Sequence, residues 1–319
     1  MSNRLAIDYF PVPIDDFLSE SLLKFTIYIK ISDDKFIKIA EAGTSIEKEK
    51  IEEYKSKSVK SLYITSDDYK KYLQLNIRLT RTLAMEPEYK IRSTKIIGSI
   101  NSMLGDLVFK NLLDKETYSE AKDICVKTLQ LASDAPTLID ILEAMKETSE
   151  KELFHATAVS FISCLIFKSL AWTYSANVHK LVFSSILHDV GKKWLSPELI
   201  NKSPSVMSSN ELKEYKKHVT TGRDLLLDVR LMSIDVIQAV YEHHETFNGT
   251  GFPNGLRGQQ ISPFARVLRI ADDFCNLVYP KEGVKELSAS EAVAVMISSK
   301  AAEYDPSILS AFKDAFKIS

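Results

Sequence analysis

Hydrophobic and polar residues alternate along the first third of the chain, which is typical of short strands with one buried face. Residues 24–31 and 36–40 both alternate, with turn-forming residues between them, so we expect a hairpin. A charged run over 47–57 predicts a helix, and residues 62–64 predict a further short strand. The inward face expected for the first strand consists of Phe25, Ile27, Ile29 and Ile31.

From about residue 69 onward the hydrophobic positions recur with the period of a helix. The segment 134–136 ends in Pro136, and proline cannot continue a helix, so a domain boundary is expected nearby. We therefore predict an α+β chain. A smaller amino-terminal α/β domain with a helical linker covers residues 1–140, and an all-helical bundle covers residues 141–319. Packing, dimerisation, sensing and partner docking all stay open as roles of the first domain.

Composition narrows the class of protein. The 319 residues are 45% hydrophobic and 26% charged, as in globular proteins, and the formal net charge is −2. No global positive field would draw the chain to DNA or to an anionic membrane. The three cysteines lie far apart without a CxxC pair, and we find neither a signal peptide nor an apolar run of membrane length. We expect a cytoplasmic protein.

All six histidines fall between positions 155 and 244. His188 and Asp189 follow an apolar helical run, and neighbouring helical residues diverge by roughly 100°. The pair could therefore straddle two metal ions, because a carboxylate offers two oxygens. Lys192 follows one turn later and would add a positive charge. A helix end with a chance acid is an equally good interpretation of this segment by itself.

His243 and His244 precede Glu245 and a loop with four glycines within ten residues. Neutral imidazole is a frequent donor to transition metals, so this pair is the better ligand candidate; the alternative is a solvated helix end. His155 and His218, taken singly, fit buried core histidines. The remaining histidine, His179, lies on the opposite helix face from His188 and is predicted to be a surface residue.

Asp272 and Asp273 follow the apolar run 267–271, and a carboxylate there is unusual unless it is paired or bound to a metal. With these acids the pattern resembles an HD-GYP domain over about residues 153–316. The resemblance rests on an ordered set of motifs: His155, His188-Asp189-Val190-Gly191-Lys192, His218, His243-His244-Glu245, Asn248-Gly249-Thr250-Gly251-Phe252-Pro253 and Ala271-Asp272.

The resemblance implies a helical bundle around two metal ions, iron first and manganese next, with zinc open on ligand type. It also implies hydrolysis of cyclic di-GMP to linear pGpG or GMP by a hydroxide that the metals activate. One metal would be held by His155, His188, Asp189 and Asp272. The other would be held by Asp189 as bridge with His218, His243 and His244. The implied catalytic residues are Asp189 and Lys192.

The resemblance further implies contacts with the cyclic dinucleotide. These fall on Lys192, Gly249, Gly251, Phe252, Pro253, Arg257, Lys281 and Lys285. A diguanylate cyclase domain protein is a partner by family analogy only.

Several positions depart from the family pattern. Phe252 replaces a tyrosine, Asn248 replaces an acid, and Val284 replaces an arginine. Lys151 stands where some members carry a glutamate for a third metal, which favours two metals here. The main hypothesis is a cyclic di-GMP phosphodiesterase of bacterial signalling. One alternative is a weakly active or inactive module that binds metals and a nucleotide or protein partner. Another is an HD-type phosphohydrolase acting on a different nucleotide.

Overall fold

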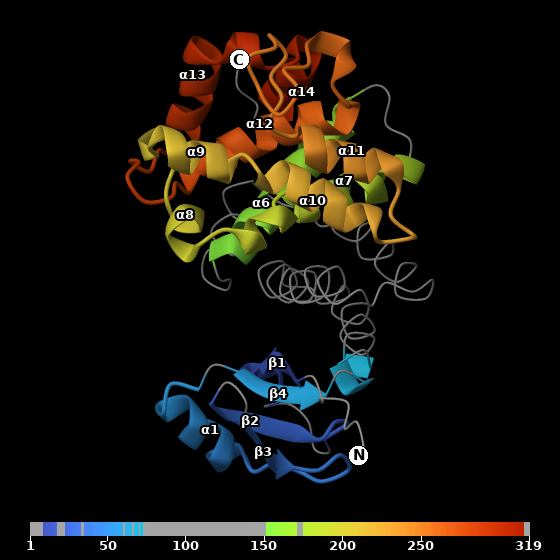
Figure 1. The fold of residues 1–319 in the computed structure, drawn as a ribbon, viewed down its shortest axis with the longest axis vertical. Helices are drawn as coiled ribbons and strands as arrows, with labels where there is room; N and C mark the ends of the chain where they lie inside the picture. Colours follow the sequence, from blue (N-terminus) through green and yellow to red (C-terminus); the bar gives the residue numbers. More distant parts are fainter. Residues whose placement is uncertain are drawn as a thin grey trace. The chain divides into compact units, whose positions relative to one another are not determined.

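The computed structural model divides the chain into two compact units, Met1–Arg78 and Leu79–Ser319 (Figure 1). Its architecture is α+β, as predicted: one unit contains a small sheet and the other is helical. The predicted boundary at 140/141, with the break at 134–136, lies outside the described residues. The structure describes residues 9–17, 23–32, 35–59, 61–65, 67–69, 71–72, 151–170 and 175–315.

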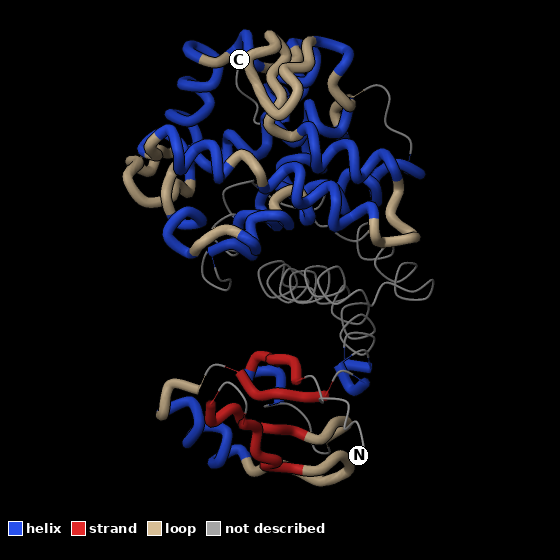
Figure 2. Tube along the Cα trace, in the orientation of Figure 1, coloured by secondary structure: helices blue, strands red, loops and turns tan. Residues whose placement is uncertain are grey.

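The first unit is built on an antiparallel four-stranded sheet with the order β1-β4-β2-β3 (Figure 2). The predicted hairpin, helix and short strand are confirmed as β2 with β3, α1 and β4. The elements are β1 (Tyr9–Pro13), η1 (Ile14–Phe17), β2 (Ile27–Ser32), β3 (Lys35–Ala40), α1 (Lys48–Ser56) and β4 (Ser61–Thr65).

Two features of this sheet differ from the expectation. The strand β1 was not predicted, because it contains Pro11 and Pro13. It lies at the edge of the sheet, where a missing N–H donor is tolerated. Ile31, expected to face inward, is 57% exposed. The pairing of β2 with β3 shifts register between Lys30 and Ser32, which interrupts the alternation of faces at the end of the strand.

The second unit packs α6 against α7, α12 and α14, and α11 against α7, α10 and α12. In the described part of the chain, no helix is both long and apolar enough to cross a membrane. The helical elements are α6 (Lys151–Lys168), α7 (Ser175–Leu187), η2 (Val190–Trp194), α8 (Pro197–Asn201), η3 (Pro204–Val206), α9 (Ser209–Tyr215), α10 (His218–Leu227), α11 (Ile234–Glu242), η4 (Gly258–Gln260), α12 (Pro263–Val278), α13 (Ala289–Ser299), η5 (Ala301–Glu303) and α14 (Pro306–Ala315).

The short helix η2 packs on α10 through backbone atoms at Gly191. A Cβ at Gly191 would lie 2.0 Å from the carbonyl oxygen of His218 and 2.6 Å from the backbone nitrogen of Gly222. No side chain fits in that space, so glycine is required for this contact. The contact sets the end of α7 directly beside the start of α10.

We predict that Gly191→Ala lowers the free energy of unfolding by about 3 kcal/mol, because the new methyl group must push two backbones apart. Denaturant unfolding, followed by circular dichroism, measures the change. Gly258→Ala is the matched control: its φ is +58° and the nearest atom to an added Cβ lies 4.0 Å away. It should cost only about 1 kcal/mol of backbone strain. Equal effects of the two substitutions would contradict the close packing of η2 on α10.

Candidate metal centre

Seven side chains that the sequence singled out come together inside the helical unit. They form two groups, and within each group the potential ligand atoms lie within 4.8 Å of one another. His179 is half-buried and belongs to neither group. The first group contains His155 from α6, His188 from the end of α7 and Asp272 from α12; the second contains Asp189, His218 from the start of α10, and His243 and His244 from the end of α11.

Three of the histidines are held in the same way by the turn of chain before them. The Nδ1 atoms of His188, His218 and His243 lie 2.6, 2.6 and 2.7 Å from the carbonyl oxygen three residues earlier. In each ring Nδ1–H donates to that carbonyl, so Nε2 carries the lone pair. A helix end therefore both orients the ring and selects the form that binds a metal.

The inward-facing atoms of this cluster have no hydrogen-bond partner among the described residues, although they are buried. They are the Nε2 atoms of His188, His218, His243 and His244, together with Oδ1 of Asp189. A buried polar atom without a partner costs about 1–3 kcal/mol, so five such atoms facing one another need an explanation. Nitrogen and carboxylate donors suit transition metals, and the residues present fit a pair of cations.

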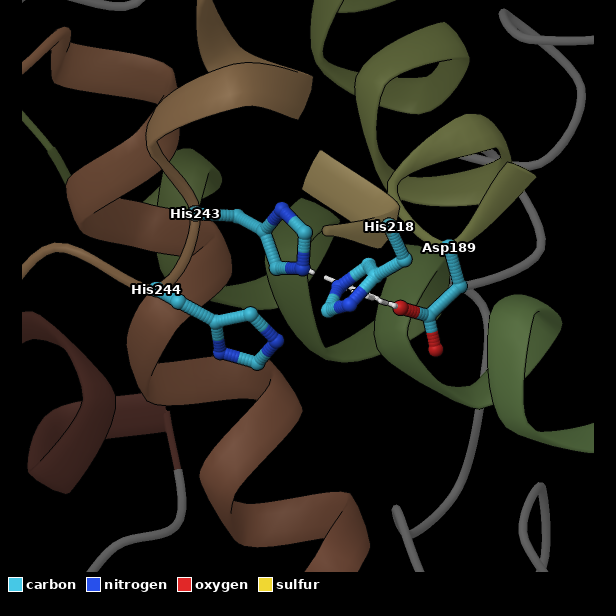
Figure 3. A group of neighbouring side chains, drawn as sticks. All are labelled: Asp189, His218, His243 and His244. Atoms are coloured by element: carbon cyan, nitrogen blue, oxygen red, sulfur yellow. Dashed lines mark ion pairs between the residues drawn. The ribbon is translucent and has the colours of Figure 1, made fainter. Parts of the chain in front are cut away.

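Asp189 turns one oxygen toward His218 and His243 (Figure 3), and its other oxygen lies nearest to His188 and His155. Its Oδ2 atom lies 3.3 Å from Nε2 of His188 and 3.9 Å from Nε2 of His155. Its Oδ1 atom lies 3.5 Å from Nε2 of His218 and 3.7 Å from Nε2 of His243. This is the arrangement of a carboxylate that bridges two ions.

Asp272 is the carboxylate of the first group. Its Oδ1 atom lies 2.9 Å from Nε2 of His155 and 3.7 Å from Nε2 of His188. The Asn276 amide, one turn further along α12, donates to the same oxygen at 2.8 Å and fixes the carboxylate. Asn276 was not predicted from the sequence, although its spacing of four residues from Asp272 is the signal that would have found it.

Burial and neighbouring charges set the protonation states. Burial lowers the pKa of His155, His243 and His244, and it lowers that of His218 to about 3. Burial opposes the charged form of His188 too, but the nearby Asp189 carboxylate raises the pKa of this ring on balance. The cluster is therefore rich in neutral imidazole.

The two carboxyl groups stay ionised despite their burial. Burial by itself raises the pKa of Asp189 and of Asp272, yet neighbouring donors hold both far below the usual range. For Asp189 the main opposing influence is the charge of Lys192, and for Asp272 it is the hydrogen bond with His155. Ionised carboxylates and neutral imidazoles are the forms that bind cations.

Two lysines lie beside the cluster. Lys192 pairs with Asp189, and its Nζ atom lies 5.0 Å from the ring centre of Tyr215. The Nζ atom of Lys281 lies 5.9 Å from the same ring centre. Burial and the charge of Lys192 lower the pKa of Lys281 to about 8. Lys285 is exposed, and no contact in the described part of the chain joins it to the histidines.

Lys281 is brought to this position by a contact between two loops. Glu282 N donates to the carbonyl oxygen of Asn201 at 3.0 Å, and Ser203 N donates to the carbonyl oxygen of Glu282 at 3.2 Å. These bonds join the segment after α12 to the end of α8.

The glycine-rich loop returns to the second group through Phe252, whose ring stacks on His244 with centres 4.7 Å apart and planes at 27°. A Cβ at Gly251 would lie 2.5 Å from the carbonyl oxygen of His244, so the loop needs glycine there. Pro253 follows through a cis peptide bond and is exposed. Arg257 is exposed as well.

Gly249 and Arg257 lie together at the outer part of this loop. Gly249 has a φ of +81°, and the Nε atom of Arg257 would be 3.0 Å from a Cβ there. The carboxylate of Glu245 accepts the backbone N–H groups of Asn254 and Leu256 at 2.6 and 3.0 Å. Glu245 therefore shapes the loop and belongs to neither ligand group.

Asp273 has a different role from Asp272. It accepts hydrogen bonds from Arg269 at 2.8 Å and from the Tyr304 hydroxyl at 2.7 Å. Arg269 also binds Glu303 at 3.1 Å, and its Nη1 atom lies 3.5 Å from Nδ1 of His244. Arg269 lies four residues before Asp273, a spacing typical of ion pairs within a helix. This pair was not predicted from the sequence.

Residues 135–308, more than half of the chain, match the HD domain family. The chain belongs to the HD domain family. Its helical unit with paired histidine and aspartate groups is that of an HD-GYP member. A solved structure described as an HDG"Y"P protein from Bdellovibrio bacteriovorus is 26% identical, with a TM-score of 0.71, and covers 97% of this chain and 100% of its own.

Curated relatives match part of this HD domain protein. A cyclic di-GMP phosphodiesterase of Pseudomonas aeruginosa is 28% identical over 183 residues, which is 57% of this chain and 44% of that protein. A 3'3'-cGAMP-specific phosphodiesterase of Vibrio cholerae is 26% identical over 51% of this chain and 35% of that protein. The chain thus spans less than half the length of these relatives.

We predict that the purified protein carries two metal ions per chain and that Asp189→Asn removes most of both. An amide cannot bridge two cations as a carboxylate does, so both groups lose affinity, on the order of 100-fold. Inductively coupled plasma mass spectrometry after metal-replete growth and desalting measures the content.

His179→Ala is the control, because His179 lies outside both groups, and it should keep two ions. Full occupancy in Asp189→Asn would disprove the bridging role, and a metal-free wild type would disprove the site.

Proposed function

We propose that this HD-GYP protein is a metal-dependent phosphodiesterase that opens cyclic di-GMP to linear pGpG, or onward to GMP. The observation that carries the proposal is Asp189, a carboxylate whose two oxygens face two separate groups of donors. Two metal ions close enough to share one carboxylate are a usual arrangement for the hydrolysis of phosphate esters. The curated relatives named cyclic di-GMP phosphodiesterases support the choice of substrate.

The proposed ligands divide between two ions. His155, His188 and Asp272 with one oxygen of Asp189 would hold the first; His218, His243 and His244 with the other oxygen would hold the second. The mixed nitrogen and oxygen donors suit iron or manganese, and the HD-GYP resemblance implies iron first and manganese next. Bound there, the ions would supply a water of lowered pKa as nucleophile and offset the charge on the phosphate.

The chain's own cations would bind and orient the substrate. Lys192 stays charged, because the adjacent Asp189 carboxylate raises its pKa although burial opposes this. Lys281 lies beside the Tyr215 ring, as Lys192 does. It would contact a phosphate oxygen that Lys192 does not reach. The burial of these groups limits water access, which strengthens their attraction for an anion.

The runner-up is a module that binds metals and a nucleotide, or a protein such as a diguanylate cyclase domain protein, with little turnover. Phe252 favours it, because its ring stacks on His244 and offers no hydroxyl to a substrate. Exposed Val284 in place of an arginine points the same way. The relative named as specific for 3'3'-cGAMP makes a different cyclic dinucleotide a further candidate substrate.

We expect metal-loaded protein, kept anaerobic with iron or manganese, to convert cyclic di-GMP to linear pGpG. Combined His188→Ala and Asp189→Ala should abolish the reaction, since each group loses a ligand. Ion-pair chromatography of the products measures turnover, with 3'3'-cGAMP assayed in parallel. Wild-type protein that carries both metals and releases no product would refute the enzyme proposal and favour the binding module.

Lys281→Ala should lower kcat/KM by about 10- to 100-fold, because a desolvated phosphate oxygen loses its cation. Steady-state rates on cyclic di-GMP measure the change. Lys213→Ala makes the same substitution at an exposed position of α9 and should leave the rate unchanged. If Lys281→Ala behaves like Lys213→Ala, then Lys281 does not contact the substrate.

A further inference from the structure

Tyr215, the last residue of α9, lies against the second ligand group. It is 4% exposed. Its carbonyl oxygen accepts the Nδ1–H of His218, and its ring centre lies 4.9 Å from the ring centre of His218 and 6.3 Å from that of His244. The carbonyl group of Tyr215 thus orients His218, and its ring lies beside both His218 and His244.

Both lysines of the site lie near the Tyr215 ring. The Nζ atom of Lys192 is 5.0 Å from the ring centre, and the Nζ atom of Lys281 is 5.9 Å from it. Lys192 has a carboxylate partner in Asp189. Lys281 is half-buried and forms no ion pair with a carboxylate in the described part of the chain. Asp189 and Asp272 attract the Lys281 ammonium group without pairing with it directly. A half-buried ammonium group without a direct ion pair favours a bound anion, and here it stands next to the Tyr215 phenol.

Phe252 occupies the loop position where the family pattern has a tyrosine, so the loop brings no hydroxyl to this site at that position. Its ring stacks on His244, and its centre is 6.5 Å from the ring centre of His218. Tyr215 therefore borders the same two histidines as Phe252, but it comes from a different element and brings an oxygen. Two aromatic rings flank the second group, and one of them carries a hydroxyl.

We propose that the Tyr215 hydroxyl donates a hydrogen bond to a phosphate oxygen, and that Tyr215, Lys192 and Lys281 together form an anion-binding pocket. Tyr215 would then supply from α9 the hydroxyl that Phe252 does not offer. The identity of the phosphate as part of a cyclic dinucleotide rests on the proposed function. The pocket itself does not, because any phosphate presents the same oxygens.

The test uses the metal-loaded full chain and inorganic phosphate as the probe. Isothermal titration calorimetry should show a phosphate Kd about 10-fold higher for Tyr215→Phe, since a hydrogen bond to a charged acceptor is lost while the ring is kept. Metal content should stay at the wild-type value. Tyr241→Phe removes a hydroxyl that contacts Asn254 at 3.3 Å, and it should leave the Kd unchanged. An unchanged Kd for Tyr215→Phe would overturn the proposal.

A second measurement needs no variant. In crystals of the wild-type protein soaked with phosphate, an oxygen of the anion should lie within about 3 Å of the Tyr215 hydroxyl. A phosphate bound at the histidine cluster but far from Tyr215 would overturn the proposal, even if Tyr215→Phe failed to fold.

Turnover of cyclic di-GMP in the same preparations separates the two proposals. If wild-type protein leaves the dinucleotide intact while Tyr215→Phe weakens phosphate binding, the anion pocket stands and the proposed enzyme function fails. If wild-type protein hydrolyses it and Tyr215→Phe matches the wild type in both phosphate affinity and rate, the enzyme function stands and the role of Tyr215 fails. In the Tyr215→Phe background, Phe252→Tyr should recover part of the lost affinity.

Discussion

The helical unit depends on a set of buried lone pairs that face one another. Nε2 atoms from four histidines and a carboxylate oxygen of Asp189 meet without a hydrogen-bond partner among the described residues. Such a cluster is unfavourable unless a cation joins it, so a cation bound there would stabilise the fold. The bonds from Nδ1 to the carbonyl three residues earlier make this feasible for His188, His218 and His243, because each of these rings is already oriented by the end of the helix before it.

Backbone contacts without side chains bring these helix ends together. Gly191 allows η2 to touch α10, which sets Asp189 beside His218, and Gly251 allows the loop to touch the carbonyl oxygen of His244. The ligand geometry is thus fixed by two places where a methyl group does not fit. Because the loop is held this closely, the Phe252 ring packs against His244, although it has no hydroxyl.

The departure from the family pattern at Asn248 has a structural role in this arrangement. Asn248 accepts hydrogen bonds from the Thr246 hydroxyl at 2.8 Å and from the backbone N–H of Thr250 at 3.2 Å, as an acid at this position would. Asp273 belongs to a separate charge network with Arg269, which approaches His244 from the side of η5. The charge of Arg269 is balanced by Asp273 and Glu303, so the cations suited to an anionic ligand are Lys192 and Lys281 near Tyr215.

The sequence alone established the local features: the helix ends that carry His188 and His243, the turn before β3, and the glycines of the loop. It also determined the α+β class, because hydrophobic period and capping act over about four residues. Only the tertiary structure decided which donors meet. His155 and Asp272 are 117 positions apart and 2.9 Å apart in space, and His155 read alone fits an ordinary core residue. Tertiary contacts likewise separated Lys281 from Lys285, made a strand of a segment with two prolines, and set Tyr215 beside the ligands. The physical reason is that residues brought together by burial and charge produce no periodic pattern in the sequence that separates them.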